Sequence, residues 1–68
     1  MSIKYPKGET VWVQYIKDGE PVFIMTSKAI RDCYYLYQRA DDGFKKLGRS
    51  KDPREMETKY EIFKKIGV

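Results

Sequence analysis

The sequence predicts an α+β fold, an antiparallel β-meander of three or four strands packed against one C-terminal α-helix. Apolar and polar side chains alternate with a period of two in segments before residue 52, turn residues separate these segments, and the apolar period lengthens to 3.6 after residue 52. Strands followed by a helix at one end of the chain are typical of α+β proteins. Since a domain usually holds about 50–250 residues, we expect residues 1–68 to form a single small domain.

The first two strands are predicted over about residues 10–16 and 22–27. In the segment TVWVQYI, strict alternation places the two valines and Tyr15 on one face of the sheet and Trp12 on the other. The dipeptide Asp18-Gly19 accepts the positive φ angles of a tight hairpin turn. The segment VFIMTS after it is rich in β-branched and aromatic residues, which favours a strand.

The third and fourth strands are predicted over about residues 33–38 and 44–48. The segment CYYLYQ contains no strand-breaking residue, and alternation places Tyr35 and Tyr37 on the face opposite Tyr34. The segment ADDG has the composition of a turn, so FKKLG is expected to return as a short strand. Residues 28–32 fit either a single helical turn or a polar loop.

The helix is predicted over about residues 53–66. Asp52 can cap its N-terminus, Pro53 suits the first helical position, and Glu55 completes a capping-box pattern. At about 100° per residue, the apolar side chains from Met56 onward form one stripe, which can cover one face of the sheet. Phe63 belongs to this stripe, and we expect it to be buried.

The composition argues against catalysis and metal binding. With no histidine and one cysteine, the chain lacks both the commonest general base and the ligand set of a structural zinc site. Its glycines are isolated, so there is no glycine-rich phosphate loop. We therefore expect a protein that is not an enzyme and that uses neither a metal nor a cofactor.

No stretch of the sequence approaches the roughly twenty apolar residues of a membrane span, so we expect no membrane partner. A lone cysteine fits a reducing compartment, which favours a cytoplasmic location. The small size and basic charge suit a bacterial or phage accessory protein that binds a larger partner.

Basic residues gather in one stretch between Phe44 and Arg54. This stretch carries five basic residues and one acidic residue. Its net charge is therefore +4, the same as that of the whole chain. A local concentration of positive charge is the electrostatic signature of a nucleic-acid binder. The basic residues are Lys45, Lys46, Arg49, Lys51 and Arg54.

The face of the sheet away from the helix is where a function is expected, since one helix cannot cover both faces. The leading hypothesis is a nucleic-acid-binding or regulatory module in which Tyr35 and Tyr37 stack on bases beside the basic residues. The alternative is a protein-interaction module, a homodimer or a complex with a larger protein, anchored by Trp12, Tyr35 and Tyr37. The same residues can also be explained without a ligand. The tyrosines would then pack on one another across strands, and the lysines would keep an edge strand from aggregating.

Overall fold

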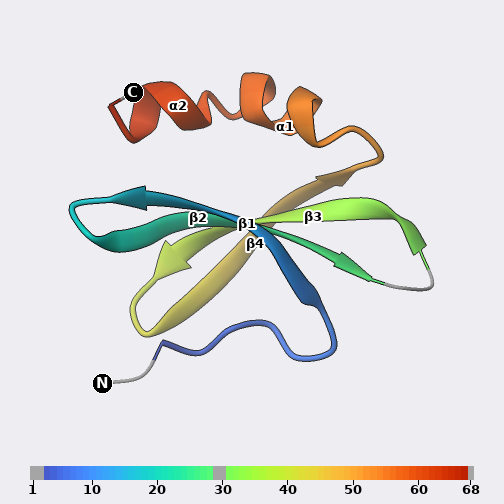
Figure 1. The fold of residues 1–68 in the computed structure, drawn as a ribbon, viewed down its shortest axis with the longest axis horizontal. Coiled ribbons are helices and arrows are strands. Elements are labelled where there is room, and N and C mark those ends of the chain that lie inside the picture. Colours follow the sequence, from blue (N-terminus) through green and yellow to red (C-terminus); the bar gives the residue numbers. More distant parts are fainter. Residues whose placement is uncertain (1–2, 29–30, 68) are drawn as a thin grey trace.

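The computed structural model describes residues 3–28 and 31–67. It contains four strands and two short helices: β1 (Thr10–Lys17), β2 (Glu20–Lys28), β3 (Arg31–Ala40), β4 (Gly43–Ser50), α1 (Pro53–Lys59) and α2 (Ile62–Lys65). The strands form one antiparallel sheet in the order β1-β2-β3-β4, and both helices lie on one side of it (Figure 1). The predicted α+β meander is confirmed, with four strands.

The connections between the strands are short. Asp18 and Gly19 both have positive φ angles, 54° and 78°, as expected for the Asp-Gly hairpin turn between β1 and β2. In the connection at 28–32, residues 29–30 lie outside the described residues, while β2 extends to Lys28 and β3 begins at Arg31. The strands are therefore longer than the sequence pattern predicts.

Each face of the sheet carries an apolar cluster. We call the face under the helices the helix face; its buried cluster consists of Tyr15, Phe23, Met25, Leu36, Met56 and Ile62. The opposite face is lined by the buried residues Ile24, Tyr35 and Tyr37. The N-terminal arm, residues 3–9, runs along this side (Figure 1), so we call it the arm face. As predicted, Tyr35 and Tyr37 lie opposite Tyr34, which packs on the helix face.

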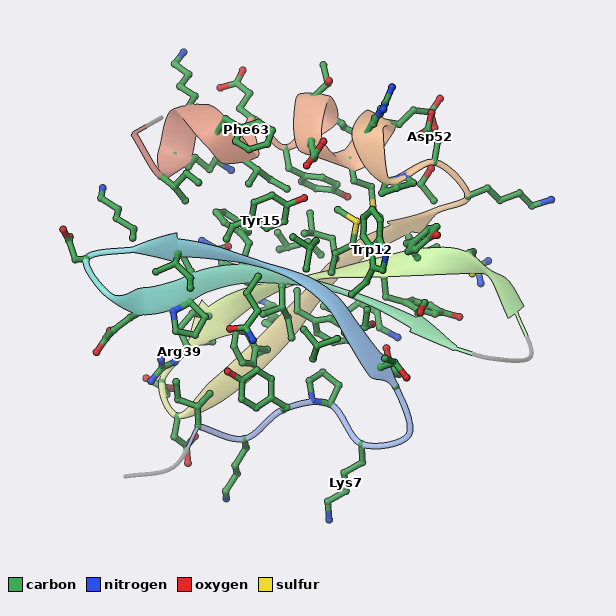
Figure 2. All side chains as sticks on the ribbon, viewed as in Figure 1. Lys7, Trp12, Tyr15, Arg39, Asp52 and Phe63 are labelled. Carbon is green, nitrogen blue, oxygen red and sulfur yellow. The ribbon has the colours of Figure 1, made fainter. Side chains whose placement is uncertain are left out.

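A β-bulge at Trp12 changes the face of the sheet to which the side chains of β1 point. The register of β1 against β2 shifts between Val11 and Val13, so Trp12 is an extra residue without a partner in the pairing. Val11 then packs on the arm face, whereas Val13 packs on the helix face. Trp12 and Tyr15 both point toward the helices (Figure 2). The predicted alternation is therefore wrong in β1, because it assumes a strand without a bulge.

The single helix predicted over 53–66 is divided in two at Glu61. The start is as predicted, because the Asp52 side chain accepts a hydrogen bond from the Arg54 N–H at 2.9 Å and Pro53 is the first helical residue. Glu61, however, has a left-handed conformation with φ 51° and ψ 46°. A residue in this conformation ends the α-helical path, so α2 starts with a new orientation.

The division at Glu61 decides which side chains reach the core. The Tyr60 hydroxyl donates a hydrogen bond to the Leu47 carbonyl oxygen at 3.1 Å, which fixes the end of α1 on β4. After the break, Ile62 is fully buried and Phe63 is 44 % exposed. The expectation that Phe63 is buried is therefore wrong, since it assumed an unbroken helix with one apolar stripe.

We expect Ile62→Ala to lower the free energy of unfolding by about 2–5 kcal/mol, because it leaves a cavity under α2. Phe63→Ala is the matched control on the next residue and should cost less, since Phe63 is 44 % exposed whereas Ile62 is fully buried. Urea unfolding followed by circular dichroism measures both. A larger loss for Phe63→Ala would contradict the position of the break.

Candidate nucleic-acid interface

A β-bulge at Leu47 places some basic residues of β4 on one face of the sheet and some on the other. Lys46 is paired with Tyr37, and Arg49 is paired with Tyr35. Directly paired residues of antiparallel strands share a face, so both cations lie on the arm face. Positions 46 and 49 differ by an odd number, and in a regular strand they would point to opposite faces. The extra residue at Leu47 brings them together.

Lys51 extends this arrangement past the end of the strand. It follows Arg49 by two positions and lines the same surface hollow as Arg49 and Cys33. All three cations are exposed, and β4 is an edge strand of the sheet. We call Lys46, Arg49 and Lys51 the basic row.

The described acidic side chains form no ion pair with the basic row. In the part of the chain that the structure describes, ion pairs join Lys4 to Asp42 and Lys64 to Glu61, and none includes a member of the row. The Lys46 ammonium group lies 4.5 Å from the centre of the Tyr35 ring, a cation–π contact that leaves its positive charge in place. The row can therefore attract an anion.

Two of the five predicted basic residues lie elsewhere. Lys45 is paired with Gln38, which places it on the helix face. Arg54 is exposed in the first turn of α1, also on the helix side of the sheet (Figure 1). The sheet thus separates residues that form one continuous stretch in the sequence.

The two tyrosines expected to stack on bases are buried. Tyr35 is 3 % exposed and Tyr37 is 6 % exposed, so the expectation that they offer accessible rings is wrong. The exposed ring on this face is Tyr5 of the N-terminal arm, whose centre lies 5.2 Å from that of Phe44 in β4. Sequence reasoning gave Tyr5 and Phe44 no role, because the arm has no periodicity that would place it against a strand.

Hydrogen bonds of Glu9 hold the N-terminal arm on the sheet. Its carboxylate accepts from the Thr26 hydroxyl at 2.6 Å and from the Tyr37 hydroxyl at 2.8 and 2.9 Å. Burial, together with this hydrogen bond and the charge of Glu9, raises the pKa of Tyr37 above its usual range, so the hydroxyl stays protonated and keeps donating. At the other end of the arm, the Lys4 N–H donates to the Asp42 carbonyl oxygen at 2.8 Å.

Trp12, the third residue of the protein-interaction hypothesis, lies on the opposite side of the sheet. It is 55 % exposed, and its ring centre lies 5.1 Å from that of Tyr34 on the helix face. The structure therefore does not bring Trp12 together with Tyr35 and Tyr37.

Within residues 3–28 and 31–67, no group of three or more His, Cys, Asp or Glu side chains is placed to hold a metal ion. The helices in the same ranges are too short or too polar to cross a membrane. Comparison of the chain with protein-family models, curated proteins and solved structures finds no match. Its function is therefore inferred from its own geometry.

We expect Tyr37→Phe to lower the free energy of unfolding by about 1–3 kcal/mol, because it leaves the part-buried Glu9 carboxylate with fewer donors. Tyr34→Phe is the matched control, since in the described part of the chain the Tyr34 hydroxyl forms no hydrogen bond. Chemical unfolding measures both variants. Equal stability of the two would show that the Glu9 hydrogen bonds do not fix the arm.

Proposed function

We propose that the protein is a non-enzymatic module that binds nucleic acid along β4. The observation that carries this proposal is the basic row, in which three exposed cations lie along the arm-face side of an edge strand and just past its end, with no ion pair to a described acidic side chain. Phosphate groups are the anions that such a row would contact, and these contacts supply most of the affinity of non-specific nucleic-acid binding.

A single strand fits this surface better than a duplex. Side chains two residues apart on one face of a strand are about 6.8 Å apart, so the row offers an extended line of charges to an extended backbone. Among the described residues, both helices lie on the other side of the sheet, so the arm face offers no helix to enter a major groove (Figure 1). Tyr5, packed on Phe44 in the same strand as Lys46, supplies an exposed ring for stacking on a base. Phosphate contacts carry no sequence information, so little sequence preference is expected.

Fluorescence anisotropy with a labelled single-stranded oligonucleotide tests the proposal. With three phosphate contacts, the logarithm of the binding constant should fall with the logarithm of salt concentration with a slope of about −2. Lys46→Glu should weaken binding strongly and reduce the slope. Lys45→Glu is the matched control, because it makes the same charge change one residue away on the other face.

Circular dichroism of both variants excludes unfolding as the cause. Equal loss of affinity in Lys46→Glu and Lys45→Glu would mean that net charge alone drives binding and would reject the basic row as the site. A failure to bind at low salt would reject the nucleic-acid function and favour the second candidate.

A second candidate function, a homodimer, is favoured by the position of the exposed apolar side chains. Trp12 and Ile16 belong to β1, and Phe63 packs edge-on against Tyr15 of the same strand with ring centres 5.7 Å apart. β1 is the edge strand opposite β4. Edge strands with apolar neighbours are suited to pairing with another strand, and a two-fold dimer is the simplest result. In such a dimer Trp12 is the anchor, and the buried Tyr35 and Tyr37 have no direct part.

If β1 forms a dimer, sedimentation should show association at high protein concentration, and the thermal midpoint should rise with concentration. Trp12→Ala should weaken the association more than Lys45→Ala, which changes an exposed residue far from β1 in the strand order. A monomer at every concentration would remove this candidate.

A further inference from the structure

A hollow of about 310 Å³ lies at the end of the basic row. It is lined by Cys33, Arg49, Ser50 and Lys51, at the place where β3 begins and β4 ends. Two of the three members of the basic row therefore form its walls. None of the described residues that line it is a carboxylate.

The hollow results from a short side chain between long ones. Tyr34 is paired with Ser50 and Tyr35 with Arg49, so Cys33 lies next to Lys51 at the end of the two strands. Cysteine has a shorter side chain than the arginine and lysine that line the hollow with it. The register of β3 against β4 positions Cys33 and Arg49, and Lys51 follows directly after β4.

The groups that line the hollow suit a phosphate-sized anion. The Arg49 guanidinium can donate two parallel hydrogen bonds to one oxyanion, and the Lys51 ammonium adds a second full charge. Neither side chain forms an ion pair or hydrogen bond with another described residue. The Ser50 hydroxyl is not counted as a donor, because it donates to the Glu55 carboxylate at 3.0 Å and accepts from the Asp52 N–H.

We infer that this hollow binds the terminal phosphate of a nucleic-acid strand, with Arg49 and Lys51 as its ligands. A terminal phosphate carries about −1.5 to −2 charges at neutral pH, like other phosphomonoesters, whereas a phosphate within a strand carries one. Two neighbouring cations around one hollow favour the more highly charged group. The hollow also lies at the end of the row, where a strand held by Lys46 would terminate. This inference rests on the proposed nucleic-acid function and adds a preference for strand ends.

The first test compares three oligonucleotides of one sequence, with a 5′-phosphate, with a 3′-phosphate, or with hydroxyl groups at both ends. Anisotropy should show binding about tenfold tighter for one of the phosphorylated strands, which also identifies the end that is bound. Lys51→Ala should weaken binding of all three strands, because Lys51 belongs to the basic row, but it should weaken the preferred phosphorylated strand about tenfold more and so remove the preference. Lys46→Ala should weaken all three strands by a similar factor and keep the preference.

The second test uses Cys33, the single cysteine of the chain, as a reporter for the hollow. Alkylation by iodoacetamide, followed by intact mass, should slow several-fold when the phosphorylated strand or inorganic phosphate is present. Chloride at equal ionic strength should not slow it, and Lys51→Ala should remove the protection.

The outcomes separate this inference from the proposed function. Equal affinity for the three strands, with unchanged alkylation of Cys33, would overturn the terminal-phosphate site and leave strand binding along β4 intact. Protection by inorganic phosphate without binding of any oligonucleotide would keep an anion site in the hollow but overturn both its assignment to a strand end and the proposed function.

Discussion

Both faces of the four-stranded sheet carry an apolar cluster, and a chain of 68 residues has to cover each face with a short segment. The helices cover one face and the N-terminal arm the other (Figure 1). Each cover is tied to the sheet by a tyrosine that donates to a glutamate. Tyr15 donates to Glu57 of α1 at 2.5 Å, and Tyr37 donates to Glu9 of the arm. Burial raises the pKa of both tyrosines, so both hydroxyls stay protonated and able to donate.

The N-terminal arm, which covers the arm face, also determines where on that face a ligand can bind. Because Glu9 holds the arm against Thr26 and Tyr37, the rings of Tyr35 and Tyr37 serve as core. The exposed groups of this face that can meet a ligand then include the Tyr5 ring and the cations Lys46 and Arg49 of β4, and Lys46 lies over the buried ring of Tyr35. The sequence predicts that this face offers tyrosine rings to a ligand. In the structure these rings are buried, and the basic row is exposed in their place.

The bulges at Trp12 and Leu47 change which face of the sheet the side chains of the two edge strands point to. At Trp12 the extra residue turns an aromatic ring toward the helix face and leaves Val11 on the arm face. At Leu47 the extra residue turns Lys46 and Arg49 to the same face and leaves Lys45 on the other. Bulges are common at sheet edges, where they re-aim side chains. Here they place the exposed tryptophan and the basic row on opposite sides of the sheet, which is why the two candidate functions use different surfaces.

Local sequence patterns were enough to predict the strands, the Asp-Gly hairpin, the opposite orientation of Tyr34 and Tyr35, and the helix start at Pro53. These features depend on side-chain periodicity, turn chemistry and capping, which act between residues close together in the chain.

The two bulges, the break at Glu61 and the position of the arm emerge only when the chain is folded. The bulges appear in the pairing of neighbouring strands, and the helix end and the arm make contacts with distant segments: Tyr60 donates to Leu47, and Glu9 accepts from Thr26 and Tyr37. One extra residue in a strand reverses the face of every side chain after it. The grouping of Lys46 with Arg49 was therefore set by the pairing of β4 with β3, and no pattern within the basic stretch itself could reveal it.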